Sequence, residues 1–521
     1  MERILKKQFF LFLIGIMFCG IINAQTQKFN KDVVLHECDG GFSIKPEISV
    51  ADNGWIYVLM NKYNHPSEND ETRIYRSKDG GITFEQIWQK TNATDVKQGG
   101  RDFVVTGNDP SNITIWYVYA DNDTQSGSTF VEILKMDADG NGETSKYNHD
   151  FLTTVTHDVA ISTNARSPDN EWTPFTIGFA VSSNYGEKGY IDYVSSKDGG
   201  ATFTKKDMYS KDSSKFGYID ISIGQGLATA WRPVVGVVFE MDKDSEENIG
   251  FIRAIADGEA VKNVLQVNKK YSATDKTKQP KIQWLCNNTL DELNNFMIVY
   301  SSLKGEDWDL VKIYPSTNYN HSENHTLDNL NWFLASSTSY CKEEYPDLAY
   351  DKKNNKYILV YRESCNNAYT LKCKSQSYTE IRASAWSNIG NISSTSTGKN
   401  FYYSPAVDVD PTRGKACFAF EHYIIDSLNI TQLVFDSEWN TNIEEHEIAK
   451  NAINVYPNPA SNVLNMISEN VNELITICDL SGKVVYSEQA SEKQSSIDIS
   501  NLSAGMYIVR IGDKATKFVK E

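Results

Sequence analysis

The nine residues Arg76-Ser-Lys-Asp-Gly-Gly-Ile-Thr-Phe84 recur almost unchanged as Ser195-Ser-Lys-Asp-Gly-Gly-Ala-Thr-Phe203. Weaker versions of the same turn occur at Met136-Asp-Ala-Asp-Gly-Asn-Gly-Glu-Thr144 and at Ile255-Ala-Asp-Gly-Glu259. The Asp-Gly pairs begin at Asp79, Asp139, Asp198 and Asp257, which are separated by 60, 59 and 59 residues. Four turns at one spacing predict a repeated structural unit of about 60 residues.

A second marker divides the same region into seven units. Each unit has a strand-like segment entered through a polar or proline-containing step, and a more apolar segment follows it; the seven segments are residues 45–50, 101–105, 157–161, 218–222, 279–283, 345–349 and 404–408. Short apolar or alternating stretches dominate and amphipathic helical patterns are scarce, which is typical of an all-β protein. Units of this size accommodate four strands each, and a closed ring buries both faces of every sheet. We therefore expect a β-propeller of about seven four-stranded blades, with six or eight as alternatives.

The last unit has no obvious outer strand after residues 429–435. The segment Lys31-Asp-Val-Val-Leu-His36 precedes the first unit and has the composition of a strand. Pairing it with the last unit would close the ring and remove two open sheet edges, so we expect that pairing.

The first 24 residues have the layout of a secretory signal peptide. Arg3, Lys6 and Lys7 precede an almost wholly apolar run over residues 9–22, and Ala24 offers a small residue at the cleavage position. The run is short for a membrane span, although an uncleaved anchor is the alternative. No later segment has the roughly 18 consecutive apolar residues of a spanning helix, so no transmembrane segment is expected in the mature chain.

The net charge of −17 argues against a nucleic-acid partner, because proteins normally bind nucleic acid through a basic surface.

Of the eight cysteines, Cys19 leaves with the signal peptide, so an odd number remains in an oxidising compartment. Cys365 and Cys373 flank a short polar turn and are the best candidates for a disulfide. No CxxC motif or Cys/His cluster predicts a zinc site, and no cofactor is expected.

The end of the chain forms a separate region. Residues 441–452 are polar and acidic, as in a linker, and residues 453–521 contain short strands separated by Ser-Gly and Ala-Gly turns, which predicts a small Ig-like β-sandwich. This region begins Asn454-Val-Tyr-Pro-Asn-Pro-Ala460 and continues with Asp479-Leu-Ser-Gly-Lys-Val484 and Leu502-Ser-Ala-Gly-Met-Tyr507. Cys478 lies on an apolar segment and is expected to be a buried small hydrophobic residue.

The order of these motifs closely resembles the type A C-terminal sorting domain of the type IX secretion system. The resemblance implies passage across a Gram-negative outer membrane by the type IX machinery, followed by removal of the tail. The protein is then released or attached to the cell surface. An unrelated adhesive sandwich domain is the alternative.

The last eight residues of each repeated stretch, 77–84 and 196–203, form two octets. These octets resemble the Asp-box, or bacterial neuraminidase (BNR) repeat, of the sialidase superfamily. The matching positions are Ser77, Asp79, Gly81, Thr83 and Phe84 in one copy and Ser196, Asp198, Gly200, Thr202 and Phe203 in the other. Asp and Ser side chains bond turn amides, Gly permits the tight backbone, and the aromatic residue packs between sheets. The resemblance covers residues 30–440 at the level of the fold, and it implies that the boxes lie on the propeller face opposite a ligand site.

The catalytic pattern of sialidases is incomplete in this chain. Their first arginine usually lies in a Phe/Tyr-Arg-Ile-Pro motif, which is absent here. Loops at the other face would carry ligand groups, and the candidates are Arg101, Asp102, His157, Asp158, Tyr345, Arg362, Glu363, Glu421, His422 and Tyr423. Arginines, carboxylates and tyrosines together could bind and cleave an acidic sugar. Ordinary polar residues at strand ends, in a solvated channel, are the alternative.

Residues Asp137, Asp139 and Asn141 alternate before Gly142 as in a Ca²⁺-binding loop. The acidic residue at the twelfth position is missing, because Asn148 stands there. The segment also keeps the spacing of the Asp-boxes, so a degenerate turn is the alternative to a calcium site.

Two classes of function follow from these patterns. The first is an exported module that binds glycans or a host protein, and the second is a secreted sialidase-like glycoside hydrolase. The absent arginine motif favours the binding module. A surface scaffold or adhesin without a small ligand is a third interpretation.

Overall fold

A computed structural model of the chain divides into two compact units, Met1–Trp439 and Asn440–Glu521. It describes residues 29, 32–39, 42–438 and 454–521, apart from 64–68, 93–95, 124–128, 152–154, 165–175, 225–232, 244–245, 256–264, 268–275, 285–295, 305–306, 316–329, 337, 339, 367, 378–385, 394–395, 398–399, 426–428, 468–473, 480–482, 491–493 and 512–513. The predicted signal peptide, the linker and the turn at Asp257 lie outside the described residues.

The described strands of the first unit form three four-stranded antiparallel sheets, one eight-stranded sheet and one nine-stranded sheet. The two larger sheets each divide into two antiparallel groups at a single parallel residue pair, Lys188 with Ser214 and Trp308 with Lys342, and the seven resulting groups are called sheets 1 to 7 here. Sheet 1 contains β2 (Ser43–Val50), β3 (Ile56–Tyr63), β4 (Glu71–Ser77) and β5 (Glu85–Thr91). Sheet 2 contains β6 (Val96–Thr106), β7 (Thr114–Asp123), β8 (Thr129–Asp137) and β9 (Thr144–Phe151). Sheet 3 contains β10 (Val155–Thr163), β11 (Ile177–Tyr185), β12 (Lys188–Ser196) and β13 (Thr204–Lys211).

The next sheets repeat this order. Sheet 4 contains β14 (Ser214–Gly224), β15 (Val234–Lys243), β16 (Glu246–Ile255) and β17 (Leu265–Gln266). Sheet 5 contains β18 (Lys276–Trp284), β19 (Phe296–Lys304), β20 (Asp307–Pro315) and β21 (Leu330–Ser336). Sheet 6 contains β22 (Cys341–Asp351), β23 (Lys356–Cys365), β24 (Ala368–Ser377) and β25 (Ser387–Asn391), and the short β26 (Ser396–Thr397) also pairs with β24.

Sheet 7 joins the two ends of the first unit. It contains β27 (Asn400–Asp410), β28 (Lys415–Ile424), β29 (Ile430–Ser437) and, as its fourth strand, β1 (Val33–Asp39). The register pairs Val33 with Phe435 and Asp39 with Ile430. The expected closure by the segment before the first unit is therefore confirmed.

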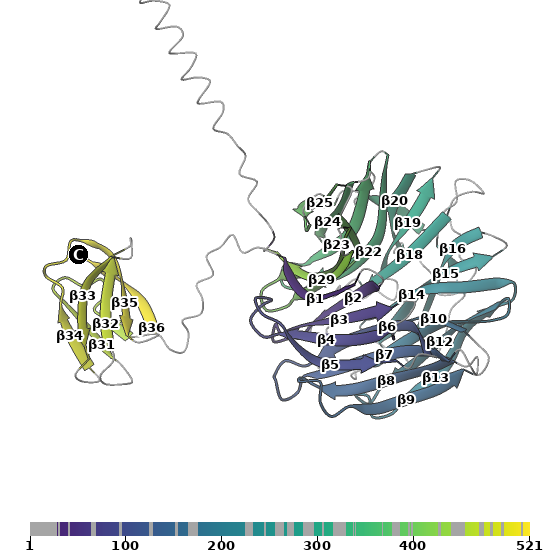
Figure 1. Ribbon diagram of the computed structural model, residues 1–521, viewed down its shortest axis with the longest axis horizontal. Helices are drawn as coiled ribbons and strands as arrows, with labels where there is room; N and C mark the ends of the chain where they lie inside the picture. Colours follow the sequence, from purple (N-terminus) through teal and green to yellow (C-terminus); the bar gives the residue numbers. More distant parts are fainter. Residues whose placement is uncertain are drawn as a thin grey trace, which may run out of the picture. The chain divides into compact units, whose positions relative to one another are not determined.

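Neighbouring sheets share apolar cores all the way around the unit. Tyr57 of sheet 1 packs in one cluster with Tyr117 of sheet 2, and equivalent clusters join each following pair of sheets. Val58 of sheet 1 packs in one cluster with Phe435 of sheet 7. In Figure 1 the sheets follow one another in chain order around the unit, and they resemble the blades of a propeller.

The first strand of each sheet lies where the polar and proline-containing steps of the sequence predict it. Because a sheet in such a ring is covered on both faces, apolar side chains occur on both sides of the second strands, as in β3, β7 and β19.

The second unit consists of two small antiparallel sheets. One contains β30 (Asn454–Tyr456), β31 (Val463–Ile467) and β34 (Gln494–Asp498), and the other contains β33 (Val484–Gln489), β32 (Leu474–Asp479), β35 (Gly505–Ile511) and β36 (Lys514–Lys520). Leu464, Ile477 and Val509 belong to a core that both sheets share. Cys478 is only partly buried, on the side of β32 away from Ile477.

Candidate functional site

The first strands of the sheets are irregular at one level. The register of β6, β10, β14, β18, β22 and β27 shifts near the start of the strand, whereas β2 pairs without a break. Such bulges re-aim side chains and are frequent beside functional sites. In three of these strands the irregular residue precedes a proline and has a left-handed backbone: Gln279 (φ 56°), Tyr345 (φ 56°) and Ser404 (φ 44°). Each such residue costs about 1–3 kcal/mol of conformational free energy, so a cluster of them suggests a functional role.

All three left-handed residues line one cavity of about 440 Å³ at the beginning of the first strands. Five tyrosines contribute to its wall: Tyr63, Tyr218, Tyr345, Tyr403 and Tyr423. The charged side chains of the wall are Lys45, Glu47, Asp158, Lys281, Asp347 and Glu421. Among the described residues that line this cavity there is no arginine.

The two lysines of the cavity are paired with carboxylates. The Lys45 ammonium lies 3.6 Å from Glu47 and 3.8 Å from Asp158, and the Lys281 ammonium lies 3.2 Å from Asp347. Burial works to lower the pKa of Lys45, but Asp158 and Glu47 outweigh it, so the pKa is raised. Both lysines are therefore charged and compensated at neutral pH.

A second cavity, of about 770 Å³, lies at the other end of the first strands. Glu47, Lys281 and Asp347 line both cavities. These three residues therefore lie where the two cavities meet.

Asp102 lines the second cavity and bonds the neighbouring sheet. Its carboxylate accepts the amide of Ile161 at 2.8 Å, and Asp220 accepts that of Ile282 at 2.7 Å in the same way. Asp347 and Asp408 repeat this contact with the amides of Val407 and Val50. Burial raises the pKa of Asp102 well above its usual value. The first-strand aspartates thus tie neighbouring sheets together, including sheet 7 to sheet 1.

Arg101 lines neither cavity. Its guanidinium is buried, donates to the carbonyl oxygens of Gly100 and Ala120, and forms an ion pair with Asp121. These partners belong to sheet 2 itself, so Arg101 stabilises its own sheet.

Arg362 lies behind the cavity wall. Its guanidinium is 4.6 Å from the ring centroid of Tyr345 and 4.7 Å from that of Tyr403, and it donates to Glu344 at 2.6 Å. Glu363 lies on the opposite face of β23 and pairs with Lys372 at 2.7 Å. The adjacent residues Arg362 and Glu363 therefore do not act at one place.

Glu421 and Tyr423 both line the cavity, whereas His422 lies on the other face of β28. There His422 stacks on Tyr402 at 4.6 Å and its Nδ1 is 3.2 Å from Gln432. Burial raises the pKa of Glu421 to about 8, against the opposing effects of the Ile44 amide and Arg362. Asp158 also lines the cavity, and the side chain of His157 lies outside the described residues.

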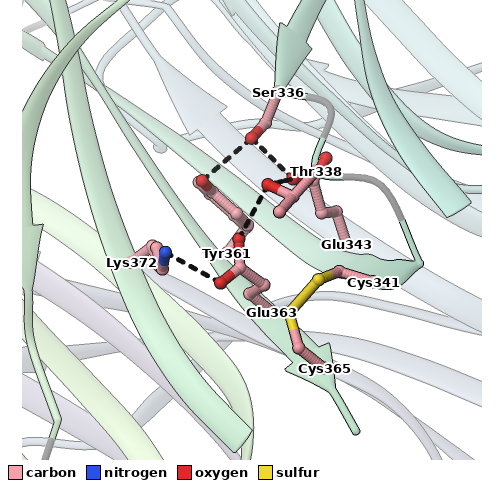
Figure 2. Close-up of a disulfide and its surroundings, with 8 residues drawn as sticks. All are labelled: Ser336, Thr338, Cys341, Glu343, Tyr361, Glu363, Cys365 and Lys372. Carbon is pink, nitrogen blue, oxygen red and sulfur yellow. Dashed lines mark hydrogen bonds and ion pairs between the residues drawn. A yellow bond between two sulfur atoms is a disulfide. The ribbon is translucent and has the colours of Figure 1, made fainter. Parts of the chain in front are cut away.

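The disulfide joins Cys341 to Cys365 (Figure 2). The expected Cys365–Cys373 bridge is wrong, because Cys365 and Cys341 are cross-strand partners in β22 and β23, whereas Cys373 lies opposite Val360 in the next strand pair. Beside the disulfide, the Ser336 hydroxyl donates to Glu343 at 2.7 Å and Thr338 bonds both Glu343 and Glu363 at 3.0 Å. Ser336 is buried and the cluster lines neither cavity, so these contacts support the fold.

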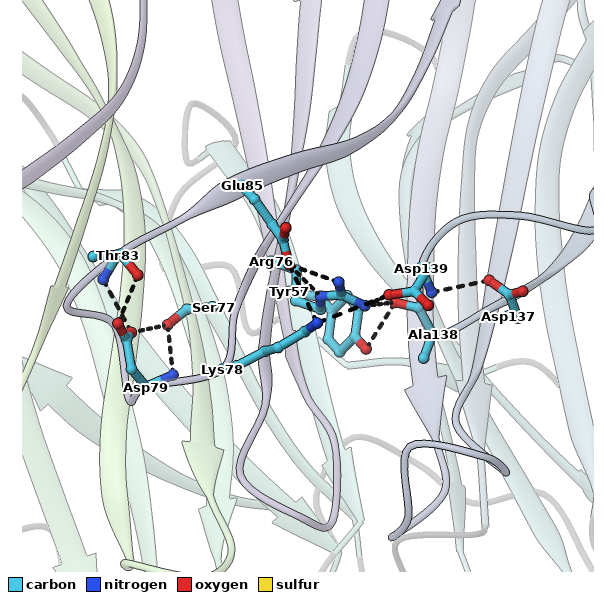
Figure 3. A network of polar contacts seen from close by, with 10 residues as sticks. All are labelled: Tyr57, Arg76, Ser77, Lys78, Asp79, Thr83, Glu85, Asp137, Ala138 and Asp139. Carbon is cyan, nitrogen blue, oxygen red and sulfur yellow. Dashed lines mark hydrogen bonds and ion pairs between the residues drawn. The ribbon is translucent and has the colours of Figure 1, made fainter.

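The two repeated octets adopt the same turn. In the first, Asp79 accepts the amide and hydroxyl of Thr83 at 3.0 and 2.6 Å (Figure 3). The Ser77 hydroxyl accepts the Gly81 amide at 2.8 Å. Ser196, Asp198 and Thr202 make the matching bonds in the second copy. The turns lie at the end of β4 and of β12, on the side opposite the tyrosine-lined cavity.

Each turn packs on the preceding sheet. Phe84 contacts Phe435 of sheet 7 with ring centroids 4.8 Å apart, and Phe203 contacts Trp116 of sheet 2 at 6.4 Å. Gly81 (φ 92°) and Gly200 (φ 80°) are required here, because a Cβ atom would lie 2.2 Å from the Phe435 ring and 2.0 Å from the Trp116 ring.

Carboxylate oxygens of the calcium candidates Asp137 and Asp139 make other contacts, and the backbone carbonyl of the third candidate, Asn141, accepts the Asp137 amide. Asp137 accepts the amide of Asp139 at 2.9 Å, and Asp139 pairs with Arg76 at 2.6 Å (Figure 3). Asp137 also accepts the amide of Asn141 at 2.8 Å. Because Asp139 is already paired with a guanidinium, a calcium ion at this turn would have to displace that ion pair. Among the described residues there is no cluster of three or more His, Cys, Asp or Glu side chains that could hold a metal ion.

Sequence reasoning missed several cavity residues, including Lys45, Glu47, Lys281, Asp347 and Tyr403. All of them belong to the polar and proline-containing steps that mark the first strands or lie next to one. The step Gln279-Pro-Lys281 and the step Tyr345-Pro-Asp347 hold the signal, because each combines a bulge with a charged residue two positions later.

Comparison with protein families gives one match, to the secretion system C-terminal sorting domain, over residues 454–521. No curated protein matches the chain. Within the described residues no helix is long and apolar enough to cross a membrane.

Solved structures resemble the chain at low identity. A protein of unknown function from Dyadobacter fermentans is 10% identical, with coverage of 79% of this chain and 100% of that one and a TM-score of 0.43. The α-L-arabinanase of Penicillium chrysogenum is 12% identical (78% and 98% coverage, TM-score 0.39), and the intramolecular trans-sialidase of Ruminococcus gnavus is 11% identical (77% and 96%, TM-score 0.37). At this level of likeness nothing about activity follows.

Proposed function

We propose that this chain, whose type IX sorting domain sends it to the outside or the outer-membrane surface of a Gram-negative cell, binds a glycan through its tyrosine-lined cavity. The sorting domain implies interaction with the type IX secretion machinery. In this proposal residues 1–24 are a signal peptide, residues 30–440 a seven-bladed β-propeller of the sialidase-like, Asp-box type, residues 441–452 a linker, and residues 453–521 an Ig-like sorting sandwich.

The observation that carries the proposal is the set of left-handed residues at the cavity. Gln279, Tyr345 and Ser404 come from three successive sheets, each breaks the strand register, and each lines the same space. A fold that needed only stability would not repeat a costly backbone conformation at one opening. Aromatic walls with a few placed polar groups are typical of small-ligand sites.

A sialidase-like glycoside hydrolase is the second candidate, and one observation favours it. Glu421 has a raised pKa at the cavity wall, as a general acid requires. Against it, the described lining contains no arginine that could bind a sugar carboxylate. The catalytic candidates Arg101, Asp102, Arg362 and Glu363 do not line this cavity either.

A glycan array with the purified protein tests the proposal. The mature chain should bind at least one class of oligosaccharide, and Tyr345→Ala should weaken that binding about tenfold or more, because it removes an aromatic wall of the cavity. Tyr185→Ala is the matched control, since Tyr185 is exposed and does not line the cavity.

The binding and hydrolase proposals differ in product formation. Incubation with the bound oligosaccharides should release no new reducing ends, and a sialic acid reporter should release no sialic acid. Binding to no glycan would contradict the proposal, and turnover abolished by Glu421→Gln would favour the hydrolase.

A further inference from the structure

The charges of the cavity bear on the class of glycan. Lys45 and Lys281 are the only cationic side chains in its described lining. Each has a carboxylate within 4 Å, so neither ammonium is available without loss of an ion pair. A ligand carboxylate or sulfate would have to displace a protein carboxylate that is already in place.

The carboxylates outnumber the lysines. Glu47, Asp158 and Asp347 face two ammonium groups, whereas Glu421, whose pKa burial raises to about 8, does not count among the charged carboxylates at neutral pH. An anionic ligand that enters this space therefore meets like charges at short range, and like charges brought together across an interface disfavour binding strongly.

Arg362 contacts two tyrosines of the cavity wall, but its charge is compensated. Glu344 accepts one of its N–H groups at 2.6 Å, and the rings of Tyr345 and Tyr403 lie on the guanidinium. Its Nε and Nη1 are shielded from solvent and make no hydrogen bond. The guanidinium thus holds the two rings, which are 6.4 Å apart at 90°, rather than facing the cavity.

The rings that Arg362 holds continue as an aromatic surface. Phe401 lies 6.4 Å from Tyr403 and 6.2 Å from Tyr423, and Tyr403 and Tyr423 both line the cavity. Tyrosine offers an apolar ring for the C–H face of a sugar and a hydroxyl for its polar edge. Glu421, next to Tyr423, is nine-tenths buried and can hydrogen-bond a sugar hydroxyl.

From these contacts we infer that the cavity selects neutral oligosaccharides and excludes those that carry carboxylate or sulfate groups, with Arg362 as a positioning residue for Tyr345 and Tyr403. This inference rests on the proposed glycan-binding function. It concerns the same site and adds the class of ligand.

Matched oligosaccharides test the selectivity. Calorimetry with the mature chain compares galacto-oligosaccharides with oligogalacturonides of equal length. The same comparison is made for further pairs of neutral and acidic oligosaccharides taken from the array. Neutral members should bind at least about tenfold more tightly than their acidic partners. Equal or tighter binding of acidic members overturns the inference while the proposed function stands, and binding of no member contradicts the proposed function itself.

A charge variant tests the cause of the selectivity. Asp158→Asn removes one carboxylate beside Lys45 and should reduce the neutral-to-acidic preference at least about threefold. An unchanged preference would mean that the carboxylates do not set the selectivity, and would overturn that part of the inference.

Arg362 variants separate positioning from acid binding. Arg362→Met should weaken neutral binding, Arg362→Lys should restore part of it, and neither should selectively reduce binding of acidic members. Glu344→Gln is the matched control, because it removes the ion pair and leaves the guanidinium between the rings. Thermal unfolding of each variant identifies any loss of fold, and a selective loss of acidic binding in Arg362→Met overturns the positioning role.

Discussion

At the scale of single residues, strand alternation decides which neighbours act together. Arg362 and Glu363 are adjacent in sequence, yet the first contacts cavity tyrosines and the second contacts Lys372. Glu421 and Tyr423 share a face, and His422 between them does not. Because successive side chains of a strand point to opposite faces, a short polar run in the sequence names candidates but not partners.

Asp79 in the first repeated turn gives a pH-dependent contribution to stability. Slight burial works to raise the pKa of Asp79, but hydrogen bonds from Thr83, Ser77 and Ile82 outweigh it, so the folded-state pKa is lowered. A lowered folded-state pKa stabilises the fold above the unfolded value, near pH 4, and this contribution is lost as the pH falls below it. Asp79→Asn should therefore cost roughly 1 kcal/mol at pH 7, after allowance for solvent screening, and less at pH 3.

Urea unfolding at the two pH values measures this difference. Asp212→Asn is the matched control, since Asp212 is an exposed carboxylate beside Lys188, and it should change stability by less than about 0.5 kcal/mol. An Asp79→Asn effect of the same size at pH 7 and pH 3 would exclude the ionised carboxylate as its source.

At the scale of elements, β1 completes sheet 7 from the other end of the chain. It pairs with β29 over Val33–Asp39, and Val33, Leu35 and Cys38 pack against the core between sheets 7 and 1. A chain that begins at residue 40 leaves the edge of β29 open, so its unfolding midpoint should fall by about 5 °C or more. A synthetic peptide of residues 29–39 should restore part of the loss by strand addition, as measured by thermal unfolding with and without peptide.

The truncated chain could instead retain the full midpoint. That result, or a peptide of scrambled sequence that stabilises equally well, would show that β1 does not contribute to closure.

The disulfide is a second element-scale feature. It closes a loop with a sequence separation of 24 between Cys341 and Cys365. A loop of that length corresponds to a stabilisation of about 3 kcal/mol through the unfolded state, so the Cys341→Ser/Cys365→Ser double variant should unfold at lower urea concentration. Peptide mapping without reductant should recover the Cys341–Cys365 pair, and a Cys365–Cys373 peptide would contradict the structure.

At the scale of the whole molecule, the two units have separate cores. The apolar cluster of the second unit draws only on residues 455–518, and none of the first unit's clusters includes them. We therefore expect the full chain to unfold in two calorimetric transitions, and removal of residues 440–521 to abolish the smaller one without shifting the larger by more than about 2 °C.

The same deletion should keep the protein inside the cell envelope, because the sorting domain lies within the deleted residues. Fractionation of cells that express the full and the shortened chain measures this. Surface display of the shortened chain would show that residues 454–521 are not needed for export.

The sequence by itself determined the destination of the protein, the seven first strands and the two repeated Asp-Gly-Gly turns. These features depend on residues close together in the chain, such as the ordered motifs of the tail and the bonds from Ser77 and Asp79 to their own turn. Only the tertiary structure decided the composition of the cavity and the disulfide partner. Lys45 belongs to sheet 1, and Lys281 and Asp347 belong to the adjacent sheets 5 and 6. All three line one cavity because the first strands of these sheets begin at the same opening, where the strands of Lys281 and Asp347 are bulged. Such contacts depend on register and ring closure, which local sequence patterns do not encode.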